Sequence, residues 1–181
     1  MKIDKTELEG VLIIQPKVYE DARGYFYESF NKSVFADAVC KEVNFVQDNQ
    51  SRSSKGTLRG LHYQLPPKAQ GKLVRVLNGE VYDVVVDIRS TSKDFGKWFG
   101  ITLSDSNRKQ LWIPEGFAHG FFTISEVAEL AYKTTDYYAP SLERSIIWSD
   151  SEINIKWPKV CKPILSSKDA KALNLNEAEV F

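Results

Sequence analysis

The residues best suited to chemistry lie between Gly56 and Val76, where a histidine and two cations share a short stretch. His62 is one of only two histidines in the chain, Arg59 precedes it by three residues and Lys72 follows it by ten. All three lie in apolar, strand-like runs, where a charged side chain is costly to bury unless it is paired or lines a wet cavity. This pattern indicates a polar site inside a β-structure, with His62 as a titratable base and two cations for an anionic ligand or intermediate.

A purely structural interpretation fits the same stretch equally well. A single histidine on a strand is often a packed core residue, and the two cations can be rim charges with buried stems. In a regular strand, Arg59 and His62 also point to opposite faces. Gly60 between them predicts a β-bulge, which would re-aim the neighbouring side chains.

A histidine that acts as a base needs a group that orients it and stabilises its charged form, commonly a carboxylate. The candidates are Asp83, Asp87, Glu143 and Asp169, and periodicity does not choose among them. A tyrosine can supply the complementary acid, and Tyr132 is expected to point inward from a strand with Tyr-rich surroundings. Packing alone also explains tyrosines in β-structures.

Short strand-like runs must position these residues. They recur at intervals of roughly ten residues between turn signals and without intervening helices, which favours an all-β sandwich or barrel over a parallel α/β sheet. A cupin-type double-sheet jelly roll with a few short peripheral helices fits best. We expect strands at 8–15, 25–30, 44–51, 57–64, 72–77, 80–88, 97–103, 110–113, 119–123, 128–134 and 145–148.

Two details of these strands can be predicted. The dipeptide Asn78-Gly79 is a strong signal for a two-residue hairpin turn between its flanking strands. In the run 80–88, Tyr82 and the alternate residues after it form an apolar face, so the opposite face with Asp83 and Asp87 should be wet or paired.

Few helices are expected in the single domain that we predict over residues 1–181. Asn31 or Ser33 is expected to cap a short amphipathic helix that ends near Cys40. Ser167 is expected to cap a C-terminal helical segment at about 166–181 that packs on the domain, with Asp169 in its first turn.

Composition argues against a nucleic-acid or membrane partner, since 24 basic and 24 acidic residues are scattered along the chain. No run approaches a membrane span, and the N-terminus lacks the apolar core of a signal peptide. Cys40 and Cys161 have no metal-ligand or redox spacing and can be ordinary small apolar residues. We therefore expect a soluble, cytoplasmic protein.

A metal site is the alternative suggested by the second histidine, His119, which starts a strand-like run after a turn at Pro114 and Gly116. Metal-binding cupins typically use about three histidines and a carboxylate. This chain has two histidines in all and no His-x-His pair. A site of two histidines and a carboxylate is the remaining alternative, but we expect no metal and no cofactor.

Two further polar segments could bind a ligand. The run 45–52 could hydrogen-bond the amide-like edges of a ligand or form a loop. Arg23 and Glu28 flank Tyr25 and Phe26, a mixture of charged and aromatic residues that suits a nucleotide base and its phosphates, or equally a subunit contact.

Taken in order, several motifs of the chain resemble the nucleotide-sugar epimerases typified by dTDP-4-dehydrorhamnose 3,5-epimerase. The most specific are Gly-Thr-Leu-Arg-Gly-Leu-His-Tyr-Gln at 56–64 and Leu-Trp-Ile-Pro-Glu-Gly-Phe-Ala-His-Gly-Phe at 111–121. Further matching segments lie at 21–28, 47–51, 72–76, 79–84, 95–98, 132–138 and 165–170.

The resemblance implies a metal-free, cofactor-independent homodimer on a cupin-type jelly roll. It implies inversion of C3 and C5 in a dTDP-linked 4-keto-6-deoxyhexose, dTDP-4-dehydro-6-deoxy-D-glucose, to give dTDP-4-dehydro-L-rhamnose on the way to dTDP-L-rhamnose. Relatives that invert only C3 share most of these residues. The alternatives are therefore a 3-only epimerase, a non-catalytic sugar-nucleotide-binding module on the same fold, and, disfavoured by the histidine count, a metal-dependent cupin oxygenase.

Position by position, the resemblance also implies roles. His62 resembles the catalytic base, Asp169 its partner carboxylate and Tyr132 the acid on the opposite face of the sugar. Lys72 resembles the residue that faces the 4-keto oxygen. The positions that resemble ligand contacts are Arg23, Phe26, Glu28, Gln47, Asp48, Asn49, Arg59, Lys72, His119, Tyr138, Glu143 and Lys168. Of these, the segment 23–28 is expected to reach the partner subunit's site.

Overall fold

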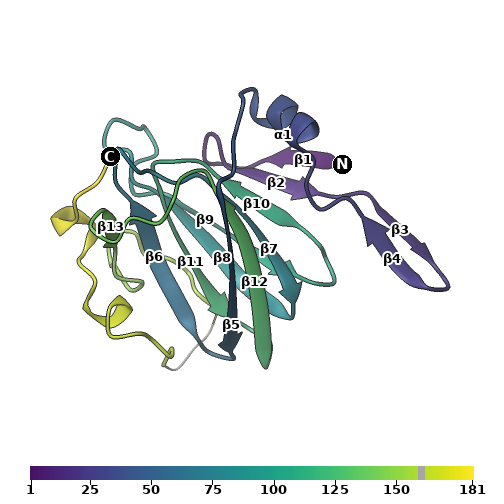
Figure 1. Cartoon of the computed structure of the whole chain (residues 1–181). Coiled ribbons are helices and arrows are strands. Elements are labelled where there is room, and N and C mark those ends of the chain that lie inside the picture. The colour runs from purple at the N-terminus through teal and green to yellow at the C-terminus, as the bar shows by residue number, and fades with distance from the viewer. Residues whose placement is uncertain (159–161) are drawn as a thin grey trace.

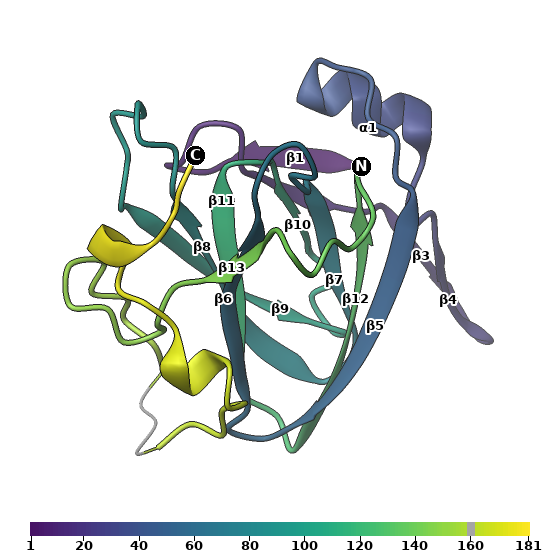
Figure 2. The same cartoon turned by 60° about the vertical axis from the view of Figure 1, so that its left-hand side comes forward.

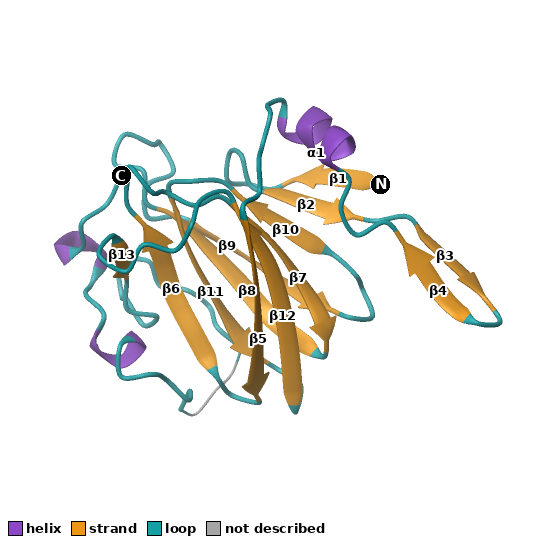
Figure 3. Cartoon of the chain, viewed as in Figure 1, coloured by secondary structure: helices purple, strands orange, loops and turns teal. Residues whose placement is uncertain are grey.

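Two antiparallel β-sheets packed against each other form the body of the protein in the computed structural model, which describes residues 1–158 and 162–181 (Figures 1 and 3). The first sheet contains, in spatial order, β1 (Lys2–Lys5), β2 (Leu12–Gln15), β10 (Gln110–Ile113), β7 (Lys72–Asn78), β12 (Val127–Thr134) and β5 (Gln47–Ser54). The second contains β13 (Glu143–Ser145), β6 (Leu58–Gln64), β11 (Phe117–Thr123), β8 (Glu80–Asp87) and β9 (Trp98–Ser104). This arrangement confirms the predicted cupin-type jelly roll.

The main core lies between the two sheets. Val74, Leu111 and Leu130 face it from the first sheet, and Val85 and Phe121 face it from the second. All five side chains are at most 5% exposed. Burying a side chain of this size contributes about 1.5–3 kcal/mol, so the alternation of apolar residues along the strands holds the sheets together.

A two-stranded hairpin and one α-helix lie outside the sheets. The strands β3 (Val18–Asp21) and β4 (Gly24–Tyr27) pair only with each other and project away from the body (Figure 1). Helix α1 (Lys32–Val39) begins as predicted, because the Asn31 side chain accepts a hydrogen bond from the Val34 N–H. The helix buries Phe35 against Trp112.

The dipeptide Asn78-Gly79 does not close a hairpin, contrary to the sequence prediction, because β7 and β8 belong to different sheets. Gly79 has φ +80°, and a Cβ atom there would lie 2.1 Å from the carbonyl oxygen of Val127. Its N–H donates to the Asp105 carboxylate at 2.7 Å. The turn at Asn78-Gly79 thus takes the chain from one sheet to the other. Packing of the sheets, rather than the turn, decides which strands pair.

The C-terminal segment, predicted to be helical at about 166–181 and to pack on the domain, is helical in two short turns only. It contains two short 3-10 helices, η1 (Asp169–Lys171) and η2 (Leu175–Glu177), each followed by an extended residue. The Asp169 N–H donates a hydrogen bond to the hydroxyl of Ser166, whereas the sequence analysis expected Ser167 to cap this segment. Figure 2 shows these turns beside β6 and β13, where Leu175 packs on the outer face of the second sheet. Contacts with the sheet therefore outweigh the local helical signal.

Other details also differ from prediction. Strands β1 and β3 were not expected, and β13 begins two residues before the predicted strand at 145–148 and ends at its first residue. Both faces of β8 are buried, with Asp83 and Asp87 each paired, as predicted for that face. Cys40 is exposed rather than packed, and Cys161 lies outside the described residues. None of the described helices is long and apolar enough to cross a membrane.

Candidate active site

A pocket of about 310 Å³ opens between the two sheets and collects most of the predicted site residues. The first sheet contributes side chains from β5, β7 and β12, and the second from β6 and β11. The predicted residues that line it are Gln47, Asn49, Arg59, His62, Lys72, His119, Tyr132, Tyr138 and Glu143.

A β-bulge in β6 brings Arg59 and His62 to the same pocket, as the sequence predicted. His62 lies opposite His119 and Arg59 opposite Phe121, so three steps along β6 match two along β11. Gly60 permits this, since its φ is +128° and a Cβ atom would lie 2.5 Å from the Cα of Gly120. The bulge resolves the parity conflict that a regular strand would impose.

His62 forms a close pair with Asp169, with 2.5 Å between Nε2 and Oδ1. Asp169 is 2% exposed, and the Ser166 hydroxyl donates to its other oxygen at 2.8 Å. Burial acts to raise the pKa of Asp169, but the hydrogen bonds and positive charge around it, led by His62, bring the pKa below its ordinary value. The carboxylate is therefore held ionised and fixed against the imidazole.

The other three candidate carboxylates have partners of their own. Asp83 Oδ1 and Oδ2 lie 2.9 and 3.0 Å from Nε2 of His119. Asp87 pairs with Arg89 at 2.6 Å, and Glu143 with Lys168 at 2.5 Å. Each histidine thus faces one aspartate, and within residues 1–158 and 162–181 no three His, Cys, Asp or Glu side chains gather as a metal site would require.

Lys72 and Tyr132 carry the other groups suited to proton chemistry. Lys72 is 9% exposed, and its Nζ donates to the His62 carbonyl at 3.2 Å. Burial lowers the pKa of Lys72 to about 8, although the negative charges of Glu143 and Asp83 act to raise it. Burial, with the charge of Glu143, raises the pKa of Tyr132. Because Tyr132 lies on the first sheet and His62 on the second, the two side chains enter the pocket from opposite walls.

The cation Arg59 is fixed by a residue that the sequence analysis did not identify. Its Nε donates to the hydroxyl of Ser53, a buried residue of β5, at 3.0 Å. Such a bond between the sheets holds the guanidinium fork in one orientation, which favours bidentate contact with an anion. A serine in a polar strand gives no sequence signal for this role.

Asp48 does not line this pocket, so its expected ligand contact stays a prediction. Alternate residues of a strand face opposite sides, so Gln47 and Asn49 line the pocket while Asp48 pairs with Lys133 at 2.9 Å on the outer face. At the rim, the Tyr138 hydroxyl donates to Glu143 at 2.8 Å, and Glu143 pairs with Lys168. Burial acts to raise the pKa of Glu143, but Lys168 and Tyr138 lower it overall.

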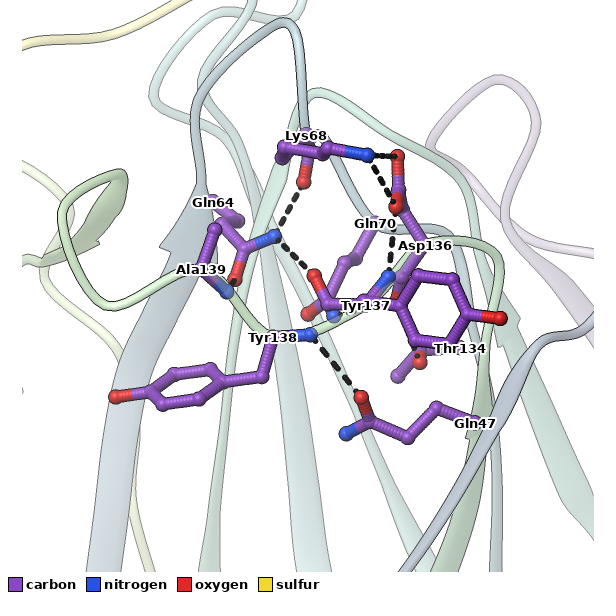
Figure 4. A network of polar contacts seen from close by, with 9 residues as sticks. All are labelled: Gln47, Gln64, Lys68, Gln70, Thr134, Asp136, Tyr137, Tyr138 and Ala139. Carbon is purple, nitrogen blue, oxygen red and sulfur yellow. Dashed lines mark hydrogen bonds and ion pairs between the residues drawn. The ribbon is translucent and has the colours of Figure 1, made fainter.

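A polar network behind Tyr138 was also missed by the sequence analysis (Figure 4). Its centre is Gln64, which is 3% exposed and bonds three backbone groups of neighbouring loops. The only sequence signal was a polar residue at the end of the predicted strand.

Three expected ligand contacts lie on or beside the β3–β4 hairpin, away from the pocket of the same chain. Arg23 pairs with Asp21 at 2.6 Å, and Phe26 is 70% exposed. Glu28 accepts a hydrogen bond from Asn31 at 3.2 Å. Their predicted reach into a partner subunit's site stays a prediction.

The chain is similar to known proteins over nearly its whole length. The family model described as dTDP-4-dehydrorhamnose 3,5-epimerase matches residues 5–177. A dTDP-4-dehydrorhamnose 3,5-epimerase of Shigella flexneri is 58% identical over 181 residues, covering 100% of this chain and 99% of the relative. The crystal structure of dTDP-6-deoxy-D-glucose-3,5-epimerase from Legionella pneumophila in complex with dTDP-4-keto-L-rhamnose has a TM-score of 0.95 at 51% identity, covering 98% of this chain and 94% of that one. A dTDP-4-dehydrorhamnose 3-epimerase of Streptomyces niveus is 38% identical over 178 residues, covering 98% of this chain and 86% of the relative.

Proposed function

The chain belongs to the dTDP-4-dehydrorhamnose 3,5-epimerase family, and we propose that it converts dTDP-4-dehydro-6-deoxy-D-glucose to dTDP-4-dehydro-L-rhamnose by inverting C3 and C5. The observation that carries this proposal is the placement of a paired histidine and a tyrosine on opposite walls of one pocket, together with a buried lysine. Inversion of a carbon needs a base on one side and an acid on the other.

The base in this mechanism is His62, which removes the proton from C3 or C5. These protons are acidic because each carbon flanks the C4 ketone, so the C–H electron pair moves into an enolate with its charge on O4. The Lys72 ammonium stabilises that charge in a buried pocket, where a fixed cation is most effective. Asp169 holds the imidazole and stabilises its protonated form.

The acid is Tyr132, whose hydroxyl delivers a proton to the opposite face of the same carbon and restores the ketone. One proton leaves the sugar and one enters, so each step is an isomerisation that needs no oxidant or reductant. The raised pKa of Tyr132 suits this role, because the hydroxyl keeps its proton until the enolate takes it.

The nucleotide diphosphate is proposed to bind through the cations and polar side chains of the same pocket. Arg59 is oriented by Ser53 and suits a phosphate, since guanidinium groups bind phosphate oxygens in pairs. Further ligand contacts are proposed for Gln47, Asn49, His119, Tyr138, Glu143 and Lys168.

We further propose a homodimer in which residues 23–28 of one chain complete the site of the other. The β3–β4 hairpin projects from the body and exposes Tyr25 and Phe26 (Figure 1). Arg108 of the body contacts the hairpin and fixes its orientation. The guanidinium carbon lies 4.1 Å from the centre of the Tyr25 ring, and Nη1 lies 3.1 Å from Oε1 of Glu20. A rigid arm with exposed aromatic side chains suits a subunit contact.

Mixing two inactive variants tests the shared site. A His62→Asn chain keeps its hairpin, and an Arg23→Ala/Phe26→Ala chain keeps its pocket. If hairpins are exchanged, the mixed dimer regains one complete site and activity returns after subunit exchange. No recovery in a mixture shown to contain mixed dimers would contradict the proposal.

We also propose that the protein acts in the cytoplasm, where an exposed thiol such as Cys40 stays reduced.

Incubation with dTDP-4-dehydro-6-deoxy-D-glucose in heavy water tests the reaction itself. Deuterium at both C3 and C5, with conversion to dTDP-4-dehydro-L-rhamnose, is the expected result. Label at C3 alone would make the protein a 3-epimerase, and no label at either carbon would make it a binding module.

A further inference from the structure

We propose that Gln64 is a positioning residue that sets the backbone around Tyr138 at the rim of the pocket. The inference rests on the proposed function, because it concerns how the same site holds its ligand. Gln64 ends β6, two residues after His62, and its side chain is nearly completely buried. It therefore connects the strand that carries the base to the segment that carries Tyr138.

The carboxamide of Gln64 bonds the backbone on both sides of Tyr138 (Figure 4). Its Nε2 donates to the carbonyl of Tyr137 at 3.0 Å, and its Oε1 accepts from the N–H of Ala139 at 2.9 Å. The same Nε2 also donates to the carbonyl of Lys68 in the preceding loop. All of these partners are main-chain groups, so the amide fixes the path of the chain rather than one side chain.

Tyr138 depends on such bonds because the residue is 54% exposed and lies in no strand or helix. Its N–H donates to the Oε1 of Gln47 at 3.0 Å, and its hydroxyl to Glu143 at 2.8 Å. Gln47 belongs to the first sheet and Gln64 to the second. The backbone at Tyr138 is thus held between two carboxamides, one from each wall of the pocket.

The Gln64 bonds are the buried part of this arrangement. Hydrogen bonds in a buried, low-dielectric setting are strong, and removing one partner leaves the other polar group unsatisfied. The loop would then lose its anchor, and an exposed loop without one opens readily. By contrast, His62 is held by Asp169 and Asp169 by Ser166, so the proton-transfer pair does not depend on Gln64.

Lys68 provides a matched control in the same network. Its ammonium pairs with Asp136 at 3.1 Å, and its side chain is 46% exposed. An exposed ion pair contributes little, and the Lys68 carbonyl that Gln64 bonds is unchanged by a side-chain substitution. Lys68→Met therefore removes the ion pair with Asp136 but keeps every Gln64 bond beside Tyr138, as well as the hydrogen bond from the Tyr137 N–H to Asp136.

The first test is amide hydrogen exchange of the free protein, which needs no ligand. In Gln64→Met, peptides covering residues 136–139 should exchange at least about tenfold faster than in the wild type, because opening is governed by the lost bonds. Lys68→Met should leave them unchanged. Wild-type exchange in Gln64→Met would overturn the inference, whatever reaction the enzyme catalyses.

The second test is a double-mutant cycle on ligand affinity. Gln64→Met should raise KM and the Kd for dTDP by about tenfold, equal to about 1.4 kcal/mol, with kcat nearly unchanged. If Gln64 acts through Tyr138, it adds nothing in a Tyr138→Ala background. Additive effects on Kd would overturn the inference, because a general loss of structure would weaken binding in both backgrounds.

A second variant covers the case in which Gln64→Met does not fold. Gln64→Glu keeps an acceptor for the Ala139 N–H, but it replaces the donor to the Tyr137 and Lys68 carbonyls with a second carboxylate oxygen and adds a negative charge. Gln64→Glu should give faster amide exchange at 136–139. Its effect on the Kd for dTDP should likewise disappear in a Tyr138→Ala background. Failure of the proposed function is read separately, from the heavy-water experiment on the wild type.

Discussion

Nε2 of His62 lies 2.5 Å from Oδ1 of Asp169, a residue 107 positions later in the chain. The pair joins a strand of the second sheet to the C-terminal segment that packs on its outer face. Because Nε2 is the nitrogen that faces the carboxylate, the dyad fixes the orientation of the ring. In the proposed mechanism, Nδ1 is then the nitrogen that accepts the sugar proton.

Asp169→Asn should therefore impair catalysis without removing the imidazole. The amide cannot stabilise the protonated ring as a carboxylate does. General-base catalysis contributes about 10²- to 10⁴-fold to the rate, so kcat should fall by a factor in that range. Deuterium wash-in at C3 and C5 measures the loss directly. His62→Ala is the reference and should abolish exchange, and near-normal turnover in either variant would contradict the assigned dyad.

Tyr132→Phe should separate proton removal from inversion. The variant keeps the ring that fills the wall of the pocket but loses the hydroxyl that protonates the opposite face. His62 can still remove and return a proton on its own side, so deuterium should enter the sugar while its configuration is retained. Inversion at wild-type rate in Tyr132→Phe, followed by NMR, would show that another group is the acid.

The pH profile of kcat/KM should fall on its basic side near pH 8 because of Lys72. Burial lowers the pKa of Lys72 to about 8, so the ammonium that stabilises the enolate loses its proton above that pH. Lys72→Arg keeps a cation to pH values above about 12, so this variant, though slower, should lose the fall near pH 8. The same basic limb in Lys72→Arg would assign it to another group.

Local signals predicted most of the strands, a cap of α1 at Asn31 or Ser33 and the bulge at Gly60, because each depends on a few neighbouring residues. The residues alone left four possible carboxylate partners for His62, and resemblance to a family was needed to select Asp169. Nothing local shows that Asn78-Gly79 joins two different sheets, or that Gln64 bonds the backbone beside Tyr138. Such contacts join distant segments, and only the packed fold decides them.

The tail that carries Asp169 should itself depend on one buried carboxylate. Asp150 is 4% exposed and accepts hydrogen bonds from the N–H groups of Glu152, Ile153 and Leu175 at 2.8, 3.0 and 2.7 Å. Asp150→Ala leaves these donors unsatisfied in a buried place, so urea denaturation should show a loss of about 2–3 kcal/mol in the free energy of unfolding.

The control for this loss is Glu126→Ala, which removes an exposed carboxylate paired with Lys55 and should leave the free energy of unfolding nearly unchanged. If Asp150 anchors the tail, its loss should also loosen the segment around Asp169, and kcat of the folded variant should fall together with faster amide exchange at 165–175. A stable Asp150→Ala protein with wild-type exchange there would mean that the apolar contacts of Leu175 hold the tail by themselves. Since the dyad spans the strand and the tail, loosening of this segment and loss of kcat are expected to occur together.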